Sequence, residues 1–148
     1  MLNELQKIYN KDFYSWTMEN ANLLRQGKFS EIDIEHIAEE LESMGKSDKR
    51  ELASRLAILI AHLLKWQFQP TMRGTSWQLT IKAQRIGVLR LLRESPSLKY
   101  QLDAIGEDAY EEAKVLAAKE TGLVESTFPA HCPFTFDQCL ESRFLPEE

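Results

Sequence analysis

The chain has 148 residues, a formal net charge of −5, and a composition of 43% hydrophobic and 28% charged residues. These values are typical of an ordinary globular protein with one core, and they exclude a disordered or fibrous chain. The longest uncharged apolar run, residues 56–64, is about half as long as a membrane span and contains His62. We therefore expect a single domain over residues 1–148.

The N-terminal residues mix acidic side chains with apolar ones and offer no small-residue cleavage site, so we expect no signal peptide. The two cysteines, Cys132 and Cys139, are too few for a disulfide framework. Both observations favour a cytoplasmic protein with reduced thiols.

The first half of the chain predicts two helices with marked ends. The first runs from about Asp12, as N-cap, to Gln26 before Gly27. The second opens at Ser30 and closes at Gly45. Apolar residues at helical spacing in the second helix predict one stripe against the core: Ile34, Ile37, Ala38, Leu41 and Met44.

The second half predicts three longer helices and a C-terminal strap. A helix from Ser47 to about Phe68 is apolar on all sides, which is typical of a central helix. The next begins after Gly74, with Thr75 and Gln78 in capping-box register, and reaches about Arg93. The last has Ser95 as N-cap, Pro96 at its first position and Thr121 near its end. The strap contains one short helix near residues 135–141. No segment alternates with period two, so the sequence predicts an all-α bundle of about five helices.

A few polar side chains interrupt the apolar helices and form our candidate site. A buried polar group without a partner costs roughly 2–7 kcal/mol, so each must find one. Helical spacing allows them to meet at one seam between helices, either as a structural polar network or as a pocket. The candidates are Glu40, His62, Trp77, Gln84 and Arg85.

Charge is segregated along the sequence. Residues 31–42 carry six acidic and no basic side chains, whereas residues 73–99 carry six basic side chains against Glu94 alone. Residues 103–112 are acidic again. These stretches are read as solvated faces, as a docking surface on which an acidic helix of one copy meets a basic helix of another, or as a nucleic-acid surface.

Patterns that carry known chemistry are weak in this chain. A di-metal bundle needs Glu-x-x-His pairs on two helices, and no such pair occurs. His131, Cys132 and Cys139 lack the second close pair of a structural zinc site. No phosphate loop or nucleophile elbow is present. We expect no metal and no cofactor, and the sequence leaves open whether the protein is an enzyme while leaning against it.

Several phrases together resemble a bacterial family described only as domain of unknown function number twenty-nine. They include DFYSW, ANLLRQGKF, EELESMGKSDKREL, HLLKWQFQP, SWQLTIKAQR, FPAHCPF and FLP. The resemblance runs from about Tyr9 to Pro146. It implies a compact all-helical domain in a bacterial, cytosolic setting, and it carries over no catalytic or binding residue.

The leading functional hypothesis is a non-enzymatic protein-interaction or regulatory module that binds a protein partner or a second copy. The alternative is a small-molecule-binding protein or enzyme with an inter-helix pocket lined by Glu40, His62, Trp77 and Arg85. Nucleic-acid binding through residues 73–99 is third. No membrane association is expected.

Overall fold

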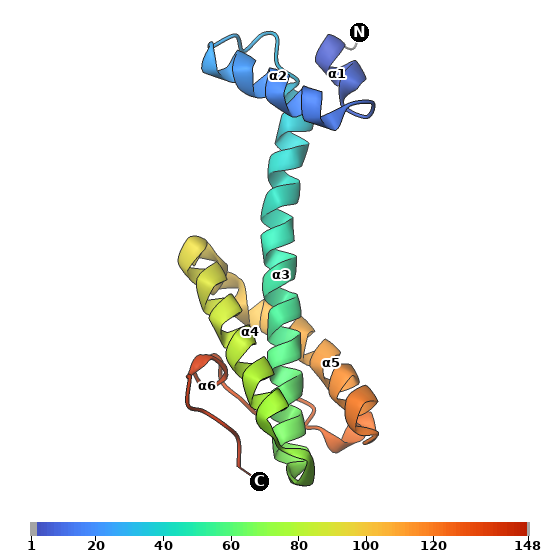
Figure 1. Cartoon of the computed structure of the whole chain (residues 1–148), viewed down its shortest axis with the longest axis vertical. Helices are drawn as coiled ribbons and strands as arrows, with labels where there is room; N and C mark the ends of the chain where they lie inside the picture. Colours follow the sequence, from blue (N-terminus) through green and yellow to red (C-terminus); the bar gives the residue numbers. More distant parts are fainter. Residues whose placement is uncertain (1–2, 148) are drawn as a thin grey trace. The chain divides into compact units, whose positions relative to one another are not determined.

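Helices are the only regular elements in the part of the chain that the computed structural model describes, residues 3–147. The prediction of an all-α fold is therefore confirmed. The chain divides into two compact units, Met1–Ser47 and Asp48–Glu148. The elements, drawn in Figure 1, are α1 (Glu4–Ile8), α2 (Phe13–Arg25), α3 (Ile34–Phe68), η1 (Pro70–Met72), α4 (Thr75–Glu94), η2 (Pro96–Gln101), α5 (Leu102–Thr121), η3 (Glu125–Thr127) and α6 (Phe136–Leu140).

The first unit consists of α1, α2 and the beginning of α3. The predicted start of α2 is confirmed, because the Asp12 side chain accepts a hydrogen bond from the backbone N–H of Ser15 at 3.0 Å. Its predicted end is confirmed by Gly27, which has a φ of +74°. Among the apolar residues described in this unit, only Leu5 and Trp16 are buried. This unit therefore has a small apolar core.

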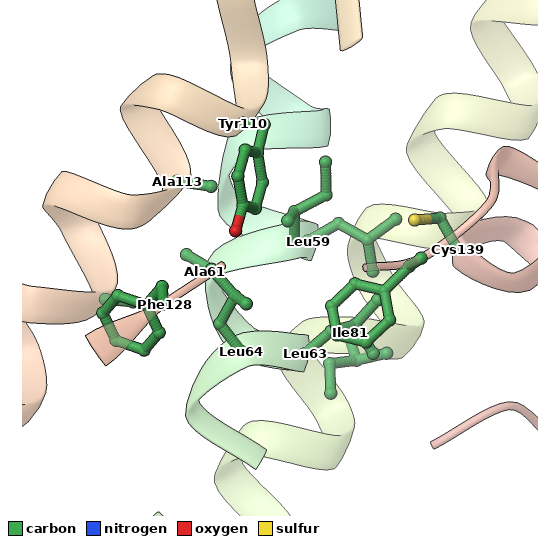
Figure 2. Packing of buried hydrophobic residues seen from close by; sticks show 12 residues of the cluster. Leu59, Ala61, Leu63, Leu64, Ile81, Tyr110, Ala113, Phe128 and Cys139 are labelled. Carbon is green, nitrogen blue, oxygen red and sulfur yellow. The ribbon is translucent and has the colours of Figure 1, made fainter. Parts of the chain in front are cut away.

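The second unit is built around the end of α3. Figure 1 shows α4 and α5 on either side of this part of α3, with α6 beside α4. Leu52, Leu56, Leu59 and Leu63 of α3 are fully buried, as predicted for a central helix. Figure 2 shows side chains of α4, α5 and the C-terminal segment packed around Leu59 and Leu63.

The predicted break between two helices at Gly45 is wrong. Residues 34–68 form one helix, α3, and Gly45 lies inside it without a positive φ. A helix-interior glycine costs about 1 kcal/mol relative to alanine, which good helix formers on both sides can offset. The helix also begins later than Ser30, with the Asp33 side chain accepting from the backbone N–H of His36 at 3.3 Å.

The predicted core stripe of this segment is also wrong. Ile34 is 63% exposed, Leu41 63% and Met44 64%. The spacing correctly indicated an amphipathic helix face, but spacing does not say whether the chain supplies anything to cover that face.

Smaller differences concern helix starts. The N-cap of α4 is Gly74 and makes no side-chain hydrogen bond, so the capping box expected at Thr75 is absent. The turn that follows Pro96 is a 3₁₀ helix, η2, and α5 begins only at Leu102. Helix α1, which has only five residues, was not predicted from the sequence. The predicted C-terminal helix is confirmed as α6, with Thr135 as its N-cap.

Candidate interaction groove

Arg85 is the predicted site residue with the most hydrogen bonds. It is buried on α4, and its guanidinium donates to main-chain carbonyls of the C-terminal segment. The distances are 2.7 Å to Cys139, 2.6 Å to Phe144, 3.4 Å to Gln138 and 3.5 Å to Ser142. The partner that Arg85 was expected to find is thus a set of main-chain carbonyls, some of which are the free carbonyls at the end of α6.

Burial lowers the pKa of Arg85, but a guanidinium stays charged at neutral pH. A cation at the C-terminal end of a short helix is also favoured by the dipole of the helix. Arg85 therefore anchors the C-terminal segment to α4.

Gln84 belongs to a separate polar cluster between α3 and α4. Its Oε1 accepts from Nη1 of Arg55 at 3.2 Å. Arg55 also donates to Glu51 at 2.8 Å, and Arg90 reaches the same Glu51 oxygen at 3.0 Å. The hydrogen bond and charge of Arg55 lower the pKa of Glu51. This cluster links two helices through half-exposed side chains.

His62 and Trp77 both lie beside Lys65, which was not predicted as a site residue. Lys65 is buried and forms an ion pair with Glu120. Its Nζ lies 3.5 Å from Nε2 of His62 and 4.7 Å from the ring centroid of Trp77. Lys65 directly follows the apolar run of residues 56–64, and this position was the available signal. A lysine in such a place is buried only if an anion pairs with its ammonium group.

The hydrogen bonds of His62 define its protonation. Its Nδ1 lies 2.9 Å from the carbonyl oxygen of Ile58, which can only accept, so Nδ1 carries the proton. Nε2 is then the acceptor that faces the ammonium of Lys65. Burial lowers the pKa of His62, and this favours the neutral ring.

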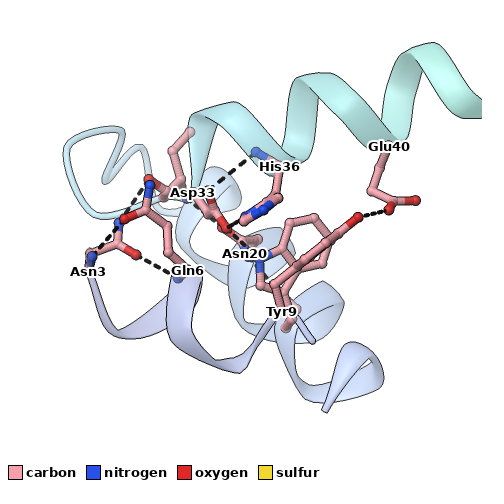
Figure 3. Close-up of polar contacts among 9 residues, drawn as sticks. Asn3, Gln6, Tyr9, Asn20, Asp33, His36 and Glu40 are labelled. Atoms are coloured by element: carbon pink, nitrogen blue, oxygen red, sulfur yellow. Dashed lines mark hydrogen bonds and ion pairs between the residues drawn. The ribbon is translucent and has the colours of Figure 1, made fainter. Parts of the chain in front are cut away.

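Glu40 lies in the first unit, where it accepts a hydrogen bond from the hydroxyl of Tyr9 (Figure 3). This bond raises the pKa of Tyr9 to about 12. The ring of Tyr9 stacks on His36 with centroids 3.8 Å apart. Among the described residues, the five predicted side chains therefore do not form one hydrogen-bonded network. They belong to four separate groups, each with its own partners: Glu40, Gln84, Arg85, and the pair of His62 and Trp77.

The buried centre of the first unit is Asp33, which was not predicted as a site residue (Figure 3). Its carboxylate accepts from Nε1 of Trp16 at 2.9 Å and from Nδ1 of His36 at 2.6 Å. Burial alone raises the pKa of Asp33, but the bonds from Trp16 and His36 outweigh burial and lower it. The spacing Asp-x-x-His at a helix start was the available signal. The arrangement ties α2 to the start of α3.

A groove lies between α4 and the C-terminal segment, with a volume of about 580 Å³. Ile86 and Leu89 remain exposed although they line it. The charged residues that line it are all basic, and no acidic residue of the described chain does so. Its charged and apolar lining consists of Lys82, Arg85, Arg143, Ile81, Ile86, Leu89, Leu140 and Leu145.

A second cavity of about 800 Å³ lies between α5 and the segment before α6. Its lining includes four exposed acidic residues of α5 together with His131, Cys132 and Cys139. Within residues 3–147 no three or more His, Cys, Asp or Glu side chains are grouped so that they could hold a metal ion. Neither of these two cavities is lined by Glu40, His62 or Trp77.

The basic stretch predicted as a nucleic-acid surface is partly occupied by internal contacts. Arg73 donates to the carbonyl of Trp66 at 2.7 Å, and Arg85 and Arg90 have the partners described above. Lys82, Arg93 and Lys99 remain exposed. Phosphate binding depends on free cations, so this surface offers fewer contacts than the sequence implied.

None of the described helices is both long enough and apolar enough to cross a membrane. Fold and geometry together define an all-helical protein with an apolar groove surrounded by basic side chains. Residues 8–145 match the model of the family described as domain of unknown function DUF29, and the chain belongs to this family. No curated protein and no solved structure matches the chain.

Proposed function

We propose that this protein is a non-enzymatic interaction module that binds an acidic amphipathic helix of a protein partner in the groove beside α4. The observation that carries the proposal is the combination of exposed apolar side chains, Ile86 and Leu89, with a charged lining that is entirely basic. Helices commonly bind partners by placing an apolar face in such a groove. Opposite charges at its edge orient the partner and accelerate its association.

The size of the apolar surface on α4 fits a helix of about three turns. Leu79 precedes Ile86 and Leu89 on the same helix and is exposed as well. These three residues span ten positions, which corresponds to about 15 Å along a helix. Arg143 lies across the groove from α4, in the C-terminal segment that Arg85 anchors.

The contacts of the predicted site residues also favour binding over catalysis. Both ring nitrogens of His62 face internal partners, and the Arg85 guanidinium is bonded to main-chain carbonyls. A general base or a substrate clamp needs a free group within reach of a substrate.

The test is a fluorescence-anisotropy titration of the full chain with two designed 18-residue helical peptides. Both carry leucines on one face, with glutamates on the other face in the first peptide and lysines in the second. We expect the glutamate peptide to bind at least tenfold more tightly. Ile86→Asp should lower its affinity at least tenfold, because the aspartate places a charge against the apolar face of the peptide.

A matched control is Val115→Asp, which adds the same charge at an exposed apolar position of α5 that lines neither cavity. It should bind the glutamate peptide like the wild type. Equal losses in both variants, or no preference between the peptides, would contradict the proposed function.

A further inference from the structure

The exposed stripe on the first part of α3 is itself an acidic amphipathic helix. Ile34, Leu41 and Met44 share a face and are exposed. Around them the helix carries exposed glutamates at positions 35, 39 and 42, and residues 31–42 contain no basic side chain. Contiguous exposed apolar side chains of this kind mark a surface that another molecule covers.

This stripe, residues 34–44, matches the groove in charge. The stripe is acidic, and the charged residues that line the groove are basic. Such a pairing of opposite charges favours this encounter over pairing of two stripes or two grooves, in which like charges would face each other.

The exposed apolar residues of the stripe also have the same spacing as those of α4. Ile34, Leu41 and Met44 lie at positions i, i+7 and i+10. Leu79, Ile86 and Leu89, the large exposed apolar residues of α4, have the same spacing. Both rows therefore extend over about 15 Å and present their side chains on the same turns of a helix.

We propose that the occupant of the groove is the stripe, residues 34–44, of a second copy of this chain. The inference rests on the proposed function and names its partner. Because the two surfaces differ, each contact joins the groove of one copy to the stripe of another. Leu41 and Met44 then lie against Ile86 and Leu89, and the glutamates of the stripe face Lys82 and Arg143.

Sedimentation velocity of two full-chain variants, alone and mixed, tests this pairing. Leu41→Asp damages only the stripe, and Ile86→Asp damages only the groove. We expect the wild type to sediment as a dimer or larger species and each variant alone to be monomeric. An equimolar mixture should regain a dimer, because it contains one intact groove and one intact stripe.

The mixture also controls for folding, since an unfolded variant could not restore association. Val115→Asp should associate like the wild type. A dimeric wild type whose variants fail to complement each other would overturn the pairing of groove and stripe. A wild type that is monomeric at 100 μM would overturn self-association. In that case, binding of the designed glutamate peptide would leave the proposed function standing, and its failure would remove both.

Discussion

At the scale of single residues, two buried cations are stabilised in different ways. Lys65 has a carboxylate partner, Glu120, together with the face of Trp77. The hydrogen-bond partners of Arg85 within residues 3–147 are carbonyl oxygens, which supply dipoles rather than a full charge. A guanidinium can satisfy several carbonyls at once because its donors point in fixed, diverging directions. A lysine at position 85 could not replace it.

His62 should make the stability of the protein depend on pH. Its pKa is lowered by burial below the ordinary value of 6.5, so the unfolded chain takes up a proton at a higher pH than the folded chain. Stability is therefore retained above pH 6.5 and lost as the pH falls below it. Urea unfolding at pH 7.5 and pH 5.5 should show a smaller loss for His62→Gln than for the wild type.

The exposed His131 provides the control for this measurement. His131→Gln should retain the pH dependence of the wild type. Equal losses in His62→Gln and the wild type would show that His62 is not the titrating group.

Cys132 should be a reactive thiol. The neighbouring thiol of Cys139 lowers the pKa of Cys132 to about 7, and the same coupling raises the pKa of Cys139. Cys132 is half-buried and lines the cavity beside α5. Since the thiolate is the nucleophile, its alkylation rate by iodoacetamide should rise through a midpoint near pH 7.

Cys139→Ala removes the neighbouring thiol and should move this midpoint upward, toward the ordinary range of a thiol. Cys139→Ser keeps a polar O–H group beside Cys132 and should shift the midpoint less. An unchanged midpoint in Cys139→Ala would contradict the assignment. Peptide mapping by mass spectrometry identifies the modified residue.

At the scale of elements, Gly106 of α5 allows α6 to pack closely. A Cβ added at Gly106 would overlap with the ring of Phe136, at the start of α6. Alanine normally stabilises a helix interior by about 0.5–1 kcal/mol relative to glycine. Here the ring must move, so Gly106→Ala should destabilise the protein by about 1–3 kcal/mol in urea unfolding.

Gly45 of α3 is the matched control. A Cβ there would meet no atom within 4 Å, and the residue lies inside a helix without a positive φ. Gly45→Ala should therefore be stabilising. If both variants gave the same change, the packing of Phe136 against Gly106 would not be the cause.

The sequence predicted most elements because their ends carry local signals. Asp12 and Gly27 bound α2, and Thr135 caps α6. Gly45 misled because glycine marks a helix end only when its φ is positive, as for Gly27 and Gly122 among the described glycines. The groove could not be predicted, since its lining joins α4 to residues more than 50 positions later.

At the scale of the whole molecule, the fold class followed from the apolar periodicity, but the candidate site did not. The sequence correctly indicated that His62, Gln84 and Arg85 need partners. It could not name these partners, because the carbonyls that Arg85 reaches belong to the chain near residue 140. Every residue type has a main-chain carbonyl, so the sequence does not show which residues accept such hydrogen bonds.

Because of its exposed apolar residues, we expect copies of this chain to associate. A small unit in which Leu5 and Trp16 are the only buried apolar residues among those described, 3–47, is poorly supported by its own core. Covering the stripe, residues 34–44, would add buried apolar area to that unit. Assembly and stability should therefore be coupled, with thermal stability rising with protein concentration.

The central claim is that the groove beside α4 binds an acidic amphipathic helix. Methyl NMR of the Leu41→Asp variant, whose own stripe is damaged, tests this claim most directly during titration with the designed glutamate peptide. We predict that the methyl resonances of Ile86, Leu89 and Leu145 shift, while that of Val115 stays unchanged. Shifts confined to other residues, or no shifts at peptide concentrations up to 1 mM, would contradict the claim.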